Sequence, residues 1–254
     1  MDSKERFAAT ADFYHRSRPS YPPESIDWIV KATSLPSTGR VLDLGAGTGL
    51  FTRLWQERGY DVLGLEPNDE MRTLAEQEGG RYAKGSGEET GLPPGSFDLA
   101  VAAQAAHWFD LDAVFAEMRR VVRPPHPFVA LWNIRADVPL LREYNDLLVE
   151  YSHEYRAWGG KLLSARTIEA FRERADVRDL VESQFRYEQR LDYELFHGRA
   201  FSSSYVIHGM KDQDGFARDL RALYDRYEEG GRVVMPYDTI VFAWRVGPPS
   251  ARSD

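Results

Sequence analysis

The stretch that decides the fold runs from Val41 to Leu50 and reads VLDLGAGTGL. Its first four residues form an apolar run, interrupted by Asp43, that predicts a buried strand. Three glycines then occupy alternate positions, and glycine readily adopts the positive φ angles of a tight turn. A helix is predicted to follow. A strand that turns through glycines into a helix is typical of a doubly wound α/β sheet, which binds ligands at the carboxyl ends of its strands.

The spacing of these glycines argues against a dinucleotide site. A loop of that kind needs the pattern G-x-G-x-x-G, but after Gly45 and Gly47 the required position holds Leu50, and Gly49 falls one residue early. Asp43 would repel a pyrophosphate, whereas its carboxylate can accept hydrogen bonds from an ammonium group, directly or through water. The loop therefore predicts a ligand with an ammonium group and no phosphate, and it counts against NAD.

A second acidic residue stands at the expected distance from the loop. Glu66 directly follows the apolar run Val62–Leu65, about 20 residues after the glycine turn. At the end of the second strand, a carboxylate can accept hydrogen bonds from both ribose hydroxyls. The alternative is a solvated carboxylate at a strand end.

The rest of the first half alternates short β-rich runs with helical stretches, which predicts a parallel sheet covered by helices. Three prolines near position 125 end the last of these helices before a strand. Residues 138 to about 180 have helical spacing and predict an insertion, and the last predicted helix, Gly215–Glu228, separates two late strands that can pair antiparallel. The predicted strands are Arg40–Leu44, Asp61–Leu65, Arg81–Lys84, Phe97–Ala103, Phe128–Trp132, Phe185–Leu195 and Val233–Val246.

Composition limits the class of partner. The chain of 254 residues has a formal net charge of -8 and no cysteine. It therefore offers no broad cationic field for nucleic acid, no disulfide and no thiolate metal site. No apolar run approaches the roughly 20 residues that a membrane span needs. We expect a cytoplasmic protein, a monomer or homodimer, that acts on a small molecule and binds neither nucleic acid nor membrane.

Several motifs together resemble the class I S-adenosylmethionine-dependent methyltransferases. The closest likeness is to the small-molecule type 11 group, which includes trans-aconitate methyltransferase-like proteins. The likeness covers about residues 10–135 well and the rest of the chain poorly. The residues that carry it are Asp43–Gly49, Glu66, Gly87–Glu88 before Leu92–Pro93, Phe97–Asp98, and Gln104–Phe109, with Tyr14–Pro22 similar to the group's N-terminal lid.

The resemblance implies a Rossmann-like, doubly wound α/β fold with a mostly parallel seven-stranded sheet and an antiparallel last strand. It implies one domain over 1–254: an N-terminal lid (1–30), a cofactor-binding core (31–135), a helical insertion or substrate cap (138–180) and C-terminal strands with a helix (181–247). The implied cofactor is S-adenosylmethionine, which leaves as S-adenosylhomocysteine. Its expected binding residues are Tyr14, Arg18, Asp43, Gly45, Ala46, Gly47, Glu66, Pro67, Gly87, Glu88 and Gln104.

The N-terminal segment has its own physical rationale. The face of an aromatic ring such as Tyr14 suits a sulfonium cation, and Arg16 or Arg18 can pair with the cofactor's carboxylate. The alternative interpretation is that Tyr14 and Tyr21 pack in the core and that the arginines are solvated.

His107 is the candidate catalytic residue. It follows the fourth strand at the carboxyl end and can titrate near neutral pH, as a general base must. Alternatively it shapes the pocket, since a carboxylate acceptor needs no base. No histidine has metal-ligand spacing, so no metal is expected. The expected substrate-binding residues are Tyr21, His107, Trp108, Trp132, Arg199 and Tyr205.

The sequence thus predicts methyl transfer from S-adenosylmethionine to an oxygen, nitrogen or carbon atom of a small molecule, for instance a carboxylate or a natural-product intermediate. Two alternatives stay open because a fold does not determine its chemistry. One is a protein of this fold that binds the cofactor for another reaction. The other is a regulatory or interaction protein that uses the helical insertion as its surface.

Overall fold

The computed structural model describes residues 17–158, 162–202, 206 and 209–248, and their contacts form two compact units. The sheet unit comprises Ser20–Trp132, Ser164–Phe185 and Thr239–Asp254, and the helical unit comprises Met1–Pro19, Asn133–Leu163 and Arg186–Asp238. The division falls inside three strands, each of which contributes residues to both units. We describe each unit separately.

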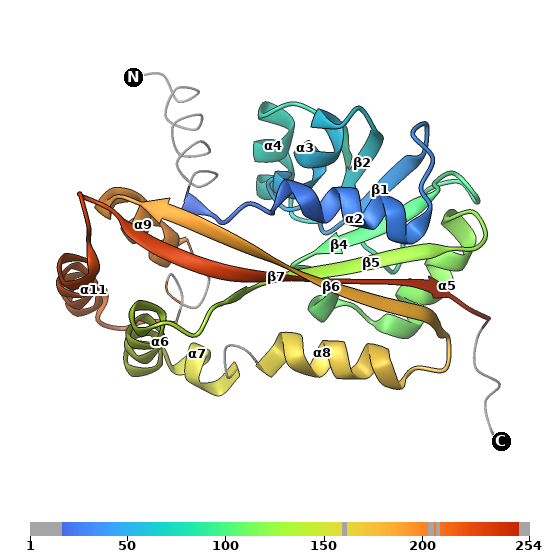
Figure 1. Cartoon of the computed structure of the whole chain (residues 1–254). Helices are drawn as coiled ribbons and strands as arrows, with labels where there is room; N and C mark the ends of the chain where they lie inside the picture. Colours follow the sequence, from blue (N-terminus) through green and yellow to red (C-terminus); the bar gives the residue numbers. More distant parts are fainter. Residues whose placement is uncertain (1–16, 159–161, 203–205, 207–208, 249–254) are drawn as a thin grey trace. The chain divides into compact units, whose positions relative to one another are not determined.

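The seven strands form one sheet in the order β3-β2-β1-β4-β5-β7-β6, mostly parallel and with the last strand of the chain antiparallel (Figure 1). This confirms the predicted Rossmann-like fold. β1 lies between β2 and β4, and Asp43 is in register with Gly64 on one side and Val101 on the other. The strands are β1 Arg40–Leu44, β2 Asp61–Leu65, β3 Tyr82–Ala83, β4 Leu99–Ala103, β5 Pro127–Arg135, β6 Val177–Leu191 and β7 Val233–Val246.

Three helices of the sheet unit begin where the sequence supplies a cap or a proline. Asn68 and Asp110 each accept hydrogen bonds from backbone N–H groups of the first helical turn that follows, and Pro23 opens a helix at a position where its missing N–H costs nothing. These helices are α2 Pro23–Thr33, α3 Leu50–Glu57, α4 Asp69–Gln77, α5 Leu111–Val121, α8 Leu162–Glu173 and the short 3-10 helix η1 Ala106–Trp108.

The central strands of this sheet are buried on both faces, and β5 shows this most clearly, since alternate residues of a strand point to opposite sides. On β5, Val129 and Leu131 join the apolar cluster beneath α2 and α3. The residues that alternate with them face the other way: Phe128 packs against Phe115 of α5 and against Trp244, and Trp132 packs against Phe171 of α8. Burial on both sides explains why these strands read as continuous apolar runs.

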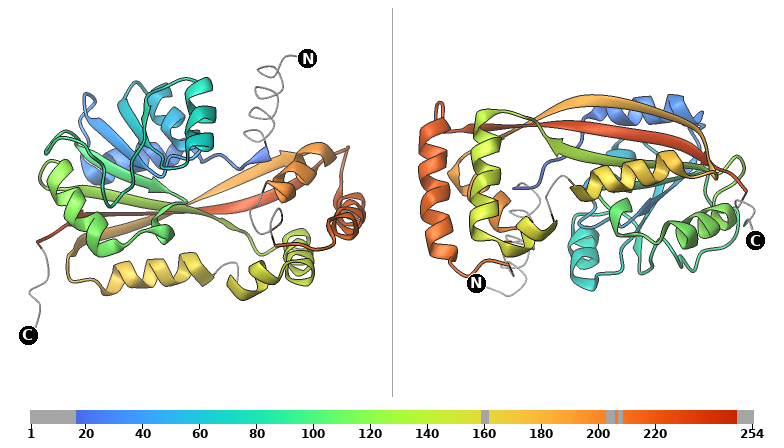
Figure 2. Two further views of the ribbon diagram at one scale, coloured as in Figure 1. Left: turned by 180° about the vertical axis from the view of Figure 1, so that it is seen from behind. Right: turned by 90° about the horizontal axis from the view of Figure 1, so that it is seen from below.

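The helical unit has an aromatic core of its own. Its helices are α6 Pro139–Tyr151, α7 His153–Trp158, α9 Tyr193–Phe201 and α11 Gln213–Tyr227. α6 and α11 pack side by side (Figures 1 and 2). Tyr144 of α6 is fully buried, with its ring centroid 5.7 Å from that of Phe196 in α9. Phe196 in turn contacts Tyr224 of α11.

Several predicted boundaries differ from the structure, and the largest errors are at the two ends of β6. β6 begins at Val177 rather than Phe185, because its first half alternates exposed charges with half-buried residues and has little apolar signal. The predicted strand Phe185–Leu195 ends early, since Asp192 accepts a hydrogen bond from the Leu195 N–H and starts α9 at Tyr193. The predicted insertion 138–180 contributes α6 and α7 to the helical unit and most of α8 to the sheet unit. The single domain stays a prediction.

Within the described ranges, we find no helix that combines the length and the apolar character required to cross a bilayer.

The packing of α8 on the sheet is testable. Phe171 is 1% exposed and contacts Phe115, Trp132 and Trp244. We expect Phe171→Ala to lower the free energy of unfolding in urea by about 3–5 kcal/mol, because it removes a buried ring and leaves a cavity. The matched control Val181→Ala, at a side chain 46% exposed, should change it by less than about 0.5 kcal/mol. Equal effects of the two variants would contradict the packing.

Candidate active site

The glycine turn after β1 is held by backbone hydrogen bonds, one to the end of β2 and one within the turn. The Ala46 N–H donates to the Leu65 carbonyl at 2.9 Å, and the Gly49 N–H donates to the Ala46 carbonyl at 2.9 Å. Gly45, Gly47 and Gly49 all have positive φ angles, between 57° and 79°. A Cβ at Gly45 would lie 2.7 Å from the Ala105 Cβ, whereas a Cβ at Gly47 would meet nothing within 4 Å. The turn thus touches the segment after β4 and leaves open space above Gly47.

Asp43 lies beneath this turn with its carboxylate buried. Its Oδ2 accepts a 2.6 Å hydrogen bond from the Thr52 hydroxyl, and its Oδ1 is buried with no hydrogen-bond partner among the described residues. Burial raises the pKa of Asp43 to about 7, a rise that the Thr52 hydrogen bond opposes and the negative charge of Glu66 increases. A buried acceptor without a donor is costly, so the site favours a ligand that brings a positive donor.

Glu66 joins the glycine turn to the end of β2. Its Oε2 accepts the Gly47 N–H at 2.8 Å, and its Oε1 accepts the Asn68 N–H at 2.8 Å. Two backbone bonds leave lone pairs on both oxygens, because a carboxylate offers about four acceptor positions. The side chain is 6% exposed. Two hydroxyl groups of one ligand can therefore still be accepted here, as the predicted ribose role requires.

Three residues of this site escaped the sequence analysis. Thr52 donates to Asp43, and Asn68 both donates to Glu66 and caps α4. Tyr82 of β3 lies against two glycines: a Cβ at Gly64 would be 2.5 Å from its Cδ1, and one at Gly49 would overlap its hydroxyl. In the sequence, only Gly49 and Gly64, which leave space for the Tyr82 ring, could have indicated its position.

Gly87 and Glu88 lie in the loop after β3. Gly87 is buried, and a Cβ there would be 3.1 Å from Val114 and 3.5 Å from Phe109. Glu88 Oε1 accepts the backbone N–H of Asp110, the residue that caps α5, at 3.1 Å. The half-buried Glu88 side chain thus has a structural contact. Its predicted contact with adenine stays a prediction.

The carboxyl end of β4 carries the predicted methyl-transfer residues. Gln104 has a positive φ of 57°, and its N–H donates to the Leu131 carbonyl of β5 at 2.9 Å. His107, in η1, accepts a hydrogen bond at Nδ1 from the Trp132 indole at 3.2 Å. Burial lowers the pKa of His107 to about 4. Trp108 is 63% exposed, with its ring centroid 4.9 Å from that of His107.

The remaining predicted residues are divided between the two units, and two of them lie outside the described residues. Tyr21 is 6% exposed, edge-on against Phe51, as the packing interpretation expects. Arg18 and Arg199 belong to the helical unit, where Arg18 donates to the Ser202 carbonyl and Arg199 is 7% exposed. Pro67 is exposed, and Ala46 is half-buried in the glycine turn. Tyr14 and Tyr205 lie outside the described residues.

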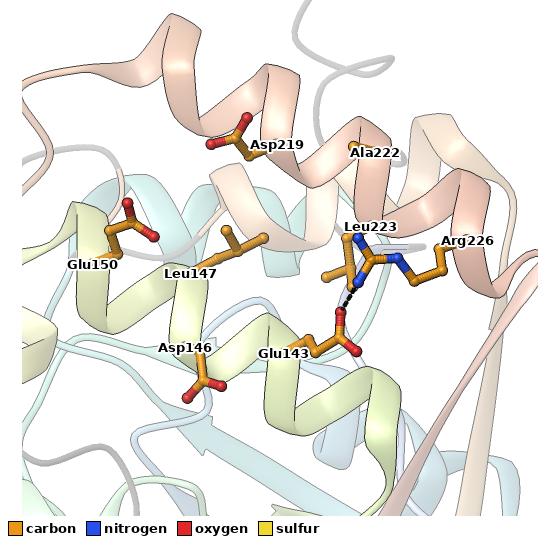
Figure 3. A pocket seen from close by; sticks show the side chains of 8 residues that line it. All are labelled: Glu143, Asp146, Leu147, Glu150, Asp219, Ala222, Leu223 and Arg226. Carbon is orange, nitrogen blue, oxygen red and sulfur yellow. Dashed lines mark hydrogen bonds and ion pairs between the residues drawn. The ribbon is translucent and has the colours of Figure 1, made fainter.

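A pocket on the helical unit lies between α6 and α11 (Figure 3). Four carboxylates line it, together with Arg226, which forms a 2.5 Å ion pair with Glu143. Among the described residues no group of three or more potential ligands is placed to hold a metal ion. Within the described residues the pocket therefore offers no metal centre.

Comparison with known proteins shows a likeness to methyltransferases. Residues 42–128, from β1 into β5, match the family described as "Methyltransferase domain". An uncharacterized methyltransferase of Mycobacterium tuberculosis is 37% identical over 150 residues, which are 58% of this chain and 60% of the relative. An uncharacterized methyltransferase-like protein of Schizosaccharomyces pombe is 30% identical over 142 residues, 54% of this chain and 56% of the relative. The chain therefore spans less than two thirds of these relatives.

A solved structure extends the likeness over nearly the whole chain. A protein of Anaeromyxobacter dehalogenans, assigned as a type II methyltransferase, superposes with a TM-score of 0.64 at 28% identity and covers 91% of this chain and 99% of its own. Residues 42–128 therefore resemble a methyltransferase domain, and the fold over most of the chain is similar to that of a protein assigned as a methyltransferase. The narrower likeness to trans-aconitate methyltransferase-like proteins stays a prediction.

The site fits the ligand of that class. S-adenosylmethionine carries an ammonium group, a ribose and no phosphate. The buried Asp43 Oδ1 lacks a donor, Glu66 has acceptor positions to spare, and the space above Gly47 is open. A pyrophosphate would meet two buried carboxylates instead, which costs electrostatic free energy.

The raised pKa of Asp43 makes folding stability depend on pH. The unfolded carboxyl group ionises near pH 4, whereas the folded one keeps its proton up to about pH 7. Between these values the folded state binds more protons, so this group should lower the free energy of unfolding by up to roughly 4 kcal/mol as pH rises from 4 to 7. Asp43→Asn keeps an acceptor for Thr52 and should remove this contribution.

Urea unfolding from pH 4 to pH 8 checks this, with Glu70→Gln as the control at an exposed carboxylate. We expect Asp43→Asn to be more stable than wild type at pH 7 and similar to it near pH 4. If the free energy of unfolding changed with pH in the same way for wild type, Asp43→Asn and Glu70→Gln, the raised pKa of a buried Asp43 would be contradicted.

Proposed function

We propose that this protein transfers a methyl group from S-adenosylmethionine to a small molecule. One observation carries the proposal: the buried Asp43 Oδ1 has no partner among the described residues, directly beneath a glycine turn with open space above Gly47. A purely structural turn gains nothing from burying a carboxylate near a second one, because each raises the cost of ionising the other. In a site that binds an ammonium group, the negative charges of both carboxylates favour the ligand.

The residues take the following roles in this proposal. Asp43 faces the amino group of the cofactor, the glycine turn lies against its methionine part, and Glu66 accepts hydrogen bonds from its ribose. Gly87 and Glu88 lie beside the adenine, and the Gln104 backbone lies at the reactive end. The strained φ of Gln104 supports this role, because such backbone strain clusters at functional sites. The bound cofactor supplies an activated methyl group on its sulfonium.

The acceptor is a small molecule in this proposal. A net charge of -8 disfavours a polyanion such as nucleic acid. The exposed Trp108 beside His107 offers an aromatic surface at the carboxyl end of the sheet. Trp132, Arg199, Tyr21 and the N-terminal residues Tyr14 and Arg18 remain candidates for binding substrate or cofactor. The acceptor atom is oxygen, nitrogen or carbon.

Calorimetry with S-adenosylmethionine and S-adenosylhomocysteine tests cofactor binding. We expect wild type to bind both and Asp43→Ala and Glu66→Ala each to weaken binding by at least about tenfold, the effect of losing roughly 1.4 kcal/mol. Asp43→Asn should weaken binding as well, because a neutral amide attracts an ammonium group less. Glu70→Gln serves as the control. If the folded wild type bound neither compound, the proposal would fail and an interaction protein would be favoured.

The acceptor class is tested by methyl transfer itself. Protein with radiolabelled S-adenosylmethionine is incubated separately with a library of small metabolites, with total RNA and with a protein extract. We expect label to appear only in the small-molecule fraction and to need Asp43. Label in RNA or protein would contradict the small-molecule acceptor, and tight binding without any transfer would support the non-methylating alternative.

A further inference from the structure

The hydrogen bond between Trp132 and His107 fixes the proton on the imidazole. The Trp132 Nε1 lies 3.2 Å from His107 Nδ1. An indole N–H is a donor only, so Nδ1 must accept and carries no proton. A neutral imidazole holds one proton, which must then lie on Nε2.

Burial stabilises this arrangement. Trp132 sits on β5 and is fully buried, with neighbours Phe171 and Phe242. If His107 became protonated or changed tautomer, the indole N–H would face another N–H and lose its acceptor, which is costly for a buried donor. Burial of the imidazole acts in the same direction, since it lowers the pKa of His107 to about 4.

The other ring nitrogen remains available. His107 is half-buried, and Nε2 has no hydrogen-bond partner among the described residues. The segment that carries it reaches the glycine turn, because Ala105 is the residue that a Cβ at Gly45 would meet at 2.7 Å. The Nε2–H group is thus a free donor two residues from the wall of the cofactor site.

We propose that Trp132 is a positioning residue that holds His107 as the Nε2–H tautomer, so that His107 donates a hydrogen bond to the methyl acceptor and does not act as its base. This inference rests on the proposed methyl transfer. In place of the general base that the sequence suggested, the site holds a donor that orients a lone pair of the acceptor. Orientation of this kind is the main contribution a protein makes to a displacement reaction.

A consequence follows for the substrate. His107 keeps its proton throughout, and Nδ1 is occupied by the indole. The favoured acceptors are therefore those whose nucleophilic atom has a free lone pair at neutral pH. Acceptors that must lose a proton during transfer lack a base at this position.

Three substitutions separate the possible roles of His107. His107→Gln places an amide N–H near the Nε2 position but removes the acceptor for Trp132. His107→Asn places an amide oxygen near the Nδ1 position, keeps that acceptor and removes the Nε2 donor. His107→Ala removes both. The measurements are production of S-adenosylhomocysteine with the acceptor found in the metabolite screen, and the free energy of unfolding of each variant.

We expect His107→Gln to retain at least about tenfold more kcat/KM than His107→Asn or His107→Ala, although His107→Asn should be the more stable protein. The kcat/KM of His107→Gln should also keep the pH profile of wild type. If His107→Asn were the most active variant, the role would be structural. If all three lost activity equally, together with the acidic limb of the pH profile, His107 would be a base. Either result would overturn the proposal.

Nitrogen NMR of the wild-type protein tests the tautomer without any substrate. We expect the His107 signals to show a protonated Nε2 and an unprotonated Nδ1 from neutral pH down to about pH 5, below the ordinary histidine pKa. A protonated Nδ1, or a cationic ring in that range, would contradict the locked tautomer. This measurement does not depend on cofactor binding, so its failure and the failure of the proposed function are distinguishable.

Discussion

The geometry of the site depends on the two hydrogen bonds that the Glu66 carboxylate accepts. It accepts one N–H from the glycine turn after β1 and one from the residue that caps α4, so it joins two βα connections at the carboxyl edge of the sheet. Parallel strands leave such edges open, and the loops that follow them must be held by side chains. Here the residue that holds the loops is also the one proposed to bind the ribose. The Glu66 carboxylate therefore contributes both to the folding of the glycine turn and to the proposed binding of the cofactor.

The buried Asp43 and the half-buried His107 both lie near this edge, and the pKa of each is shifted toward its neutral form. Asp43 has its pKa raised to about 7, and His107 has its pKa lowered to about 4, in both cases chiefly by burial. The two are not equivalent. Asp43 has a buried oxygen that no described residue provides with a donor, so a cationic ligand improves its environment. His107 has its Nδ1 satisfied by Trp132, so it is stable as a neutral ring that offers one N–H.

Local sequence predicted the elements that are short, apolar and bounded by turns. The strands Arg40–Leu44, Asp61–Leu65 and Val233–Val246 have the predicted limits, because their runs are buried and their ends carry glycine or charge. β6 was misplaced because a half-exposed strand has little apolar signal, and α9 was not predicted at all. The contact of Trp132 with His107 depends on β4 and β5 lying side by side, and that of Thr52 with Asp43 depends on how α3 packs back on β1. Residue spacing along the chain contains no such information, so the hydrogen-bonded partners of Asp43 and His107 needed the structure.

A crystal structure of the protein grown with S-adenosylhomocysteine tests the central claim most directly. We expect the ligand to lie over the glycine turn, with its ribose hydroxyls on Glu66 and its amino group on the side of Asp43 Oδ1, directly or through one water. The Trp132 to His107 hydrogen bond should remain. A ligand bound elsewhere, or one that contacts neither carboxylate, would contradict the assignment of this turn as the cofactor site.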